Sequence, residues 1–177
     1  MHLDGARVFN ASVASGVPAR EYARYFDSVS FCLSKGLGCP VGSVVLGSAE
    51  LIEKVHRYRK MFGGGMRQVG ILAAAGIYAL EHNISRLKKD HDNAKRLGRA
   101  LQGVKGLTIN PEEVETNIVI FDVQDTGMDA PTLTDHLRQS GVLMLPISQT
   151  RIRAVTHLDV NPEDIDQAIE MAHRLLS

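Results

Sequence analysis

The sequence predicts an α/β fold followed by a smaller α+β unit. Two short apolar runs, at residues 29–33 and 43–46, have the length and composition of buried strands, and helical patterns occupy much of 48–80. Further along the chain the composition shifts, and short strands interleave with helices. We therefore expect one domain over residues 1–82, a connecting helix over 83–103, and a small C-terminal domain over 104–177.

The first of these parts contains three segments of strand character and one weak helix. Residues 1–8 are expected to be the end of a short strand that turns into a loop, strands are expected at 29–33 and 43–46, and the helix is expected at 18–26. Pro18 suits the first turn of that helix, because its fixed φ is already helical and the first turn needs no N–H donor. Glycines and a proline between the last two strands interrupt regular structure. This strand–turn–strand unit would lift Lys35 out of the sheet.

Three further helices are expected before residue 103. Ser48 is a good N-cap for a helix whose apolar residues recur on one face, and Gly63–Gly65 ends that helix. From Met66 a segment rich in alanine and large apolar residues predicts a buried helix. A strongly charged helix with a leucine-rich stripe is expected from about residue 83 to 102.

The remaining residues predict four strands and two helices. The strands are expected at 107–109, 117–123, 142–145 and 152–156, and the helices at 130–140 and 162–176. The last helix has the clearest signals, with Asn161 as N-cap and Pro162 at its first position. Gly141 directly follows the other helix, where a left-handed residue commonly ends a helix.

Composition argues against several functional classes. Twenty basic and twenty acidic residues cancel, so no field of one sign favours nucleic acid or an anionic membrane. No apolar stretch approaches the ~20 residues that span a bilayer, and the N-terminus does not resemble a signal peptide. The two cysteines lack a CxxC pattern, and no group of histidines has metal-ligand spacing. We expect a cytoplasmic protein with ordinary thiols and no metal.

Lys35 and Asp4 are the strongest candidates for chemistry. Lys35 lies in SKGLG, directly after the apolar run that ends at Leu33, and Asp4 lies 31 residues upstream in HLDGAR. A lysine on a glycine-rich turn is placed to form a Schiff base with an aldehyde, and a carboxylate can hold a protonated pyridine nitrogen. The pair predicts a pyridoxal 5′-phosphate (PLP) site. The alternatives are a surface lysine and an aspartate that caps a helix.

Four further basic residues could complete such a site. Arg7 follows Asp4 closely and could reach the cofactor ring or a substrate carboxylate. Lys60 and Arg67 flank the three glycines at 63–65, where a backbone nest with two cations would favour a phosphate. Arg153 and its neighbour Arg151 alternate on one strand, and either could clamp a carboxylate if their face looks into a cleft.

In combination, these segments resemble the low-specificity L-threonine aldolases, PLP enzymes of fold type I in the aspartate-aminotransferase superfamily. The resemblance rests on four stretches in order, namely HLDGARVFNA (2–11), DSVSFCLSKGLGCPVGSVVLG (27–47), RKMFGGGMRQVGILAAAGIYAL (59–80) and RAVTHLDV (153–160). It implies the C-terminal part of the family's PLP-binding large domain followed by its small domain. Family members have roughly another half-chain before HLDGAR, so the resemblance implies that this sequence matches the C-terminal half.

The resemblance also implies roles for the candidate residues. Lys35 matches the lysine that carries PLP, and Asp4 matches the partner of the pyridine nitrogen. Arg7 matches an arginine near the cofactor and the substrate carboxylate. Lys60 and Arg67 match basic residues near the phosphate, contributed by a neighbouring subunit, and Arg153 matches the arginine that holds the α-carboxylate. The expected activity is cleavage of L-threonine or L-allo-threonine to glycine and acetaldehyde, by a homo-oligomer.

Two alternatives stay open. Another fold type I enzyme, such as an aminotransferase or a β-eliminating lyase, would use the same lysine and aspartate. A chain that lacks the family's first half could also be catalytically incomplete, because that half supplies a ring-stacking histidine and a phosphate-binding turn. The residues do not indicate threo or allo preference, the number of subunits, or the base that accepts the β-hydroxyl proton.

Overall fold

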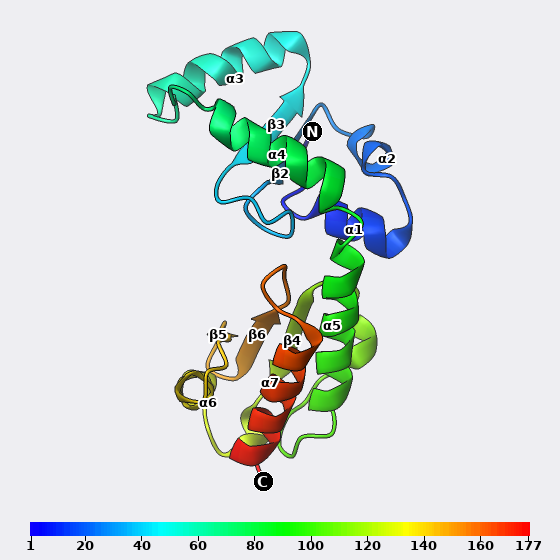
Figure 1. Cartoon of the computed structure of the whole chain (residues 1–177), viewed down its shortest axis with the longest axis vertical. Coiled ribbons are helices and arrows are strands. Elements are labelled where there is room, and N and C mark those ends of the chain that lie inside the picture. The colour runs from blue at the N-terminus through cyan, green and yellow to red at the C-terminus, as the bar shows by residue number, and fades with distance from the viewer. The chain divides into compact units, whose positions relative to one another are not determined.

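The computed structural model describes all 177 residues, which form two compact units, residues 1–87 and 88–177. Figure 1 shows both units along the chain. No helix in either unit combines the length and apolar character that crossing a membrane requires. The two units are described separately below.

The first unit is built on a three-stranded sheet, β1 (His2–Asp4), β2 (Ser28–Cys32) and β3 (Ser43–Gly47), in the order β1-β2-β3. β1 and β2 are parallel, and β2 and β3 are antiparallel. One face of β2 is buried through Val29 and Phe31, because successive side chains of a strand point to opposite faces. The other face carries polar side chains, and there His2 Nδ1 lies 2.8 Å from the hydroxyl of Ser28.

Four helices surround this sheet, α1 (Val8–Ser15), α2 (Ala19–Ala23), α3 (Ala49–Met61) and α4 (Gly70–His82) (Figure 1). Ser48 caps α3 as expected, since its hydroxyl accepts a hydrogen bond from Leu51 N at 3.3 Å. The short strand does turn into a loop after Asp4 as expected, but α1, which begins at Val8, was not expected. Its start has no side-chain cap, and it is held by packing, with Phe9 edge-on to Phe31 at 5.2 Å between ring centroids.

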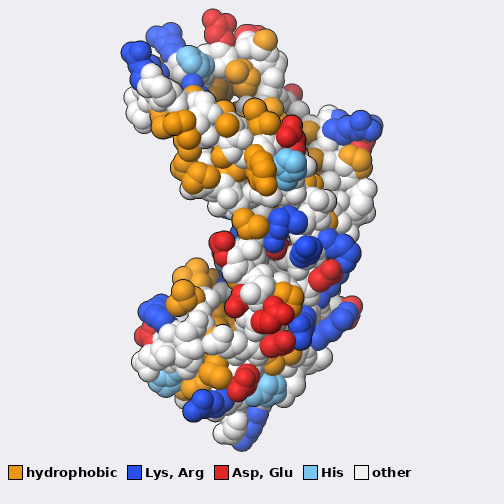
Figure 2. Space-filling view, in the orientation of Figure 1, with side chains coloured by type: hydrophobic (Ala, Val, Ile, Leu, Met, Phe, Trp, Pro, Cys, Tyr) orange, Lys and Arg blue, Asp and Glu red, His pale blue; other side chains and the backbone are white.

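The apolar segment after Met66 forms a helix as predicted, but the prediction that this helix is buried was wrong. α4 packs only one stripe of small residues, including Gly76 and Ala79, against the first unit. Its large apolar side chains are exposed, with Ile71 at 78% and Tyr78 at 61%. Figure 2 shows hydrophobic side chains gathered over α4 on the visible face. Composition alone indicated burial, but within the first unit no element covers that side of the helix.

The second unit has a three-stranded antiparallel sheet, β4 (Ile118–Asp122), β5 (Leu145–Pro146) and β6 (Arg151–Val155), in the order β4-β6-β5. Its helices are α5 (Leu87–Leu101), α6 (Ala130–Gln139) and α7 (Pro162–Leu175), with two 3₁₀ turns, η1 (Pro111–Glu113) and η2 (Gln124–Thr126). One apolar core joins all three helices to the buried sheet face. The expected connecting helix is α5, which begins at Leu87 and contributes Ala94, Leu97 and Leu101 to this core.

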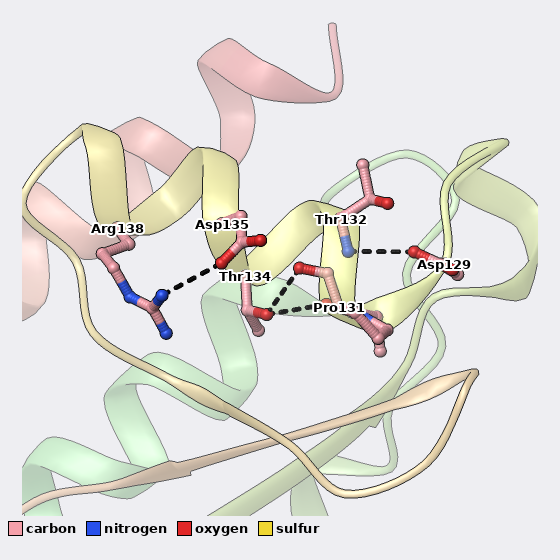
Figure 3. Close-up of polar contacts among 7 residues, drawn as sticks. Asp129, Pro131, Thr132, Thr134, Asp135 and Arg138 are labelled. Carbon is pink, nitrogen blue, oxygen red and sulfur yellow. Dashed lines mark hydrogen bonds and ion pairs between the residues drawn. The ribbon is translucent and has the colours of Figure 1, made fainter.

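Helix starts in the second unit follow the caps that the sequence indicates. Asn161 and Asp164 form a reciprocal capping box at α7, with both hydrogen bonds at 2.9 Å. At α6 the carboxylate of Asp129 accepts a hydrogen bond from Thr132 N (Figure 3), and hydrogen bonding by the side chain and the backbone of Thr132 lowers the pKa of Asp129. The Thr134 hydroxyl donates back to carbonyls of the first turn, as Figure 3 also shows. These contacts set the helix boundaries locally.

Two expected strands are shorter than predicted. Between 107 and 109 only Thr108 pairs, across to Asp122, because Leu107 N donates to Val104 O in a turn. At 142–145 the strand shrinks to Leu145–Pro146. There Gly141 N and Val142 N donate to the carbonyls of Arg138 and Leu137, so this backbone completes the end of α6 instead of a ladder.

Buried His91 on α5 predicts a stability change in acid. Burial holds its pKa below the ordinary 6.5, against a smaller opposing effect of Asp90. Because the unfolded chain then binds this proton at higher pH, the contribution is complete above 6.5 and is lost as pH falls toward the folded pKa. We expect the urea midpoint to fall more steeply from about pH 7 to about pH 5 in the unsubstituted protein than in His91→Gln. Parallel pH profiles for the two proteins would contradict this assignment.

Candidate active site

Asp4 and Lys35 lie at the same edge of the first unit's sheet. Asp4 is the last residue of β1 and pairs in register with Ser30 of β2. Lys35 follows the end of β2 by three residues. Because β1 and β2 are parallel, their carboxyl ends reach one edge, where ligands of open α/β sheets commonly bind. The structure therefore places at the same edge of the sheet a lysine and a carboxylate that are 31 residues apart in sequence.

Backbone hydrogen bonds and close packing hold the loop that carries Lys35. Lys35 O accepts a hydrogen bond from Gly38 N at 2.9 Å, and Leu33 N donates to Gly42 O at 2.9 Å. Gly36 is packed so closely that a Cβ there would lie 2.8 Å from the side-chain oxygen of Asn10. The side chain of Lys35 is exposed, whereas Gly36 and Leu37 are buried. A tightly held backbone thus presents a lysine whose amine is accessible.

Asp4 and Arg7 flank the turn from β1 into α1. Gly5 N donates to Ser30 O at 2.8 Å, and a Cβ on Gly5 would come within 2.9 Å of that oxygen, so this position requires a glycine. The carboxylate of Asp4 accepts a hydrogen bond from Ala6 N at 3.2 Å and is otherwise exposed. Arg7, half-buried, occupies the N-cap position of α1. The HLDGAR motif therefore forms one rigid corner at the edge that bears Lys35.

Lys60 and Arg67 line one pocket of approximately 210 Å³ at the end of α3. His56 and Arg59 join them, and no carboxylate contributes to the lining. Pattern reasoning did not select His56 or Arg59, although His56 lies three residues before Arg59 and four before Lys60 and so shares a helix face with them. Uncompensated cations around one cavity favour an anion such as a phosphate. The lining does not include Lys35, Asp4 or Arg7.

In the second unit Arg151 and Arg153 have different partners, a difference that strand alternation alone did not predict. Both lie on β6 and share the sheet face opposite the core. Arg151 Nε lies 3.8 Å from the carboxylate of Asp122, its cross-strand neighbour. Arg153 has apolar neighbours instead, and its Nε is buried without a hydrogen-bond partner. A buried unsatisfied donor is costly, so Arg153 is the arginine with capacity for an external carboxylate.

Comparison with known proteins places the chain in a family. Residues 1–126 match the family described as beta-eliminating lyase. The chain belongs to this family. This chain is 45% identical over 166 residues to low-specificity L-threonine aldolase 1 of Arabidopsis thaliana, covering 93% of this chain and 46% of the relative. It is 46% identical to the low specificity L-threonine aldolase of Escherichia coli strain K12, covering 93% of this chain and 47% of that protein.

Solved structures support the fold. A putative L-allo-threonine aldolase from Listeria monocytogenes superimposes with a TM-score of 0.74 at 18% identity, covering 99% of this chain and 52% of that one. A putative aromatic amino acid beta-eliminating lyase/threonine aldolase from Exiguobacterium gives 0.78 at 20% identity, covering 98% and 52%. The α/β prediction and the resemblance to threonine aldolases are confirmed. The chain spans about half the length of the curated relatives it matches.

Proposed function

We propose that this chain contributes to a PLP-dependent aldolase that cleaves L-threonine or L-allo-threonine to glycine and acetaldehyde. The observation that carries the proposal is the parallel pairing of β1 and β2, which sets Asp4 and Lys35 at one sheet edge. The names of the relatives support an aldolase, and the fold neighbours support the cofactor class.

The residues present fit PLP. Lys35 offers an accessible amine on a fixed loop, and Asp4 offers an exposed carboxylate at the same edge. PLP, when bound, acts as an electron sink for a bond broken at the substrate Cα. Asp4 would keep a ring nitrogen protonated through a charge-assisted hydrogen bond, and Lys35 would hold the cofactor by its amine. Arg7 would supply a positive charge beside them.

The second unit would contribute an arginine for the substrate carboxylate. Arg153 would grip the α-carboxylate with its planar fork, which fixes the direction of the Cα–Cβ bond. Lys60 and Arg67, together with His56 and Arg59, would hold a phosphate, that of a neighbouring subunit in a homo-oligomer. The exposed apolar side of α4 supports such an assembly, since large exposed apolar patches mark interaction surfaces.

A second candidate function is β-elimination, which the family description favours. An aminotransferase also remains a candidate, since an alanine–glyoxylate aminotransferase from Nostoc matches the fold with a TM-score of 0.66. The three reactions differ in what they release from threonine. Retro-aldol cleavage releases glycine and acetaldehyde in equal amounts, β-elimination releases ammonia and an oxo acid, and transamination requires an oxo-acid acceptor.

The test is product analysis with the full chain, PLP and L-threonine in the absence of any oxo acid. We expect equimolar glycine and acetaldehyde, measured by amino-acid chromatography and by an aldehyde-specific dehydrogenase assay. Ammonia in place of glycine would identify the lyase alternative. Neither product, from protein that retains PLP after dialysis, would show that the chain is catalytically incomplete.

A further inference from the structure

Arg153 stands between two exposed apolar side chains. In the sheet of the second unit it pairs with Ile120 of β4 on one side and with Leu145 of β5 on the other. All three side chains lie on the face opposite the core. Ile120 is 46% exposed and Leu145 58% exposed, so apolar side chains flank the arginine on both sides at the surface. This row is called the Arg153 row.

The neighbouring row of the same sheet contains Arg151, a surface arginine with a carboxylate partner. Arg151 pairs with Asp122, and the two form an ion pair. On the β5 side, Ile147 N donates to Arg151 O at 2.9 Å. The two rows thus differ in one respect that matters for binding, because Arg151 has an internal carboxylate and Arg153 has none. The Nε of Arg153 is nevertheless buried, so it is desolvated without compensation.

We propose that Ile120 and Leu145 are specificity-determining residues, forming two apolar walls of a slot whose floor is Arg153 and which accepts a planar carboxylate. This inference rests on the proposed function, whose substrate carboxylate it concerns. Side chains directly across neighbouring strands have Cβ atoms about 5 Å apart. The Cβ atoms of Ile120 and Leu145 therefore lie about 10 Å apart, with Arg153 between them.

The walls have two effects on an anion. They exclude water from the guanidinium, and a charge-assisted hydrogen bond strengthens when its surroundings are less polar. They also favour a planar carboxylate, which meets the arginine fork edge-on through two parallel hydrogen bonds, over a tetrahedral sulfate. Ile120 and Leu145 thereby confer a preference that the arginine alone does not have.

The experiment follows the arginine Nε–H resonances of the full chain by ¹⁵N NMR while N-acetylglycine is added. This probe carries a carboxylate but no free amine, so it cannot condense with PLP, and the titration needs no catalysis. Assignment uses Arg153→Lys, which should remove the responding signal. Sulfate serves as the tetrahedral comparison. We expect the Arg153 signal to shift with N-acetylglycine and to respond more weakly to sulfate.

Polar replacements of the walls supply the decisive comparison. Ile120→Thr combined with Leu145→Thr should weaken N-acetylglycine binding about fivefold or more and reduce the preference over sulfate. Threonine keeps strand propensity, so the sheet is retained. Ile120→Val keeps an apolar wall and should bind like the unsubstituted protein. Ile147→Thr, on the neighbouring row, is the matched control and should change nothing.

The outcomes separate this inference from the proposed function. If N-acetylglycine shifts the Arg153 signal but the double threonine variant binds equally well, the apolar walls have no role and this inference is overturned alone. If no carboxylate shifts the Arg153 signal in the unsubstituted protein, the slot does not exist and Arg153 loses its assigned role as well. Product formation from threonine tests the reaction itself and is independent of both results.

Discussion

Replacing Lys35 by alanine is expected to abolish covalent capture of PLP by this chain. Lys35 is the lysine that follows a buried strand on a fixed glycine-rich loop at the edge that bears Asp4. Borohydride reduces the imine between lysine and the PLP aldehyde to a stable secondary amine, so the unsubstituted protein should gain one phosphopyridoxyl group by intact mass. The Lys35→Ala variant should gain none, and threonine cleavage should fall on the order of a thousandfold or more.

A matched control comes from α3. Lys54 is an exposed lysine in the same unit whose Nζ is paired with Glu50 at 2.6 Å, and nothing assigns it to the cofactor. Lys54→Ala should therefore capture PLP like the unsubstituted protein. Peptide mapping of the reduced protein locates the modified residue directly. A phosphopyridoxyl group that persists in Lys35→Ala, or one mapped to another lysine in the unsubstituted protein, would refute the assignment.

Truncating Leu101 to alanine should produce the largest loss of stability in the second unit. Leu101 lies in the last turn of α5 with no exposed surface, within the core that backs β4 and β6. Leucine-to-alanine changes at such positions cost about 2–5 kcal/mol, because the lost transfer energy is joined by an unfilled cavity. The expected result in urea is a lower unfolding midpoint with an unchanged m-value.

Leu143→Ala is the control for this experiment. Leu143 is 77% exposed, so its truncation should change the unfolding free energy by no more than about 0.5 kcal/mol. Because β6 carries Arg153 on the face opposite this core, Leu101→Ala should also weaken carboxylate binding near its unfolding midpoint, but not far below it. A cost for Leu101→Ala as small as that for Leu143→Ala would mean that α5 does not pack on this core.

Predictions from local pattern succeeded where the stabilising contacts are local. The capping box joins Asn161 and Asp164, which are only three residues apart in sequence, and α7 begins where those residues indicate. The apolar run at 29–33 became β2, because a strand with one buried face is specified by its own alternation. α1 was missed for the opposite reason. Its stability comes from Phe9 packing on Phe31, a contact between residues 22 apart.

In the candidate site, too, local motifs predicted some features and tertiary contacts decided the others. The motifs around Asp4 and Lys35 indicated which residue types were present, but only the parallel register placed them at one edge. Alternation put both arginines of β6 on one face, and the position of Asp122 across the sheet then distinguished them. His56 and Arg59 joined the pocket of Lys60 and Arg67 through the turn after α3, which no local pattern specifies. The roles of all these residues remain proposals.

By itself, the sequence determined the chemical inventory of this protein, its helix caps, most of its strands and its membership of a family of lyases. Only the tertiary structure decided which of those groups meet, which arginine lacks an internal partner, and which side of α4 is left uncovered. The physical reason is that propensity and capping act over a few neighbouring residues, whereas register and burial depend on contacts between residues far apart in the chain.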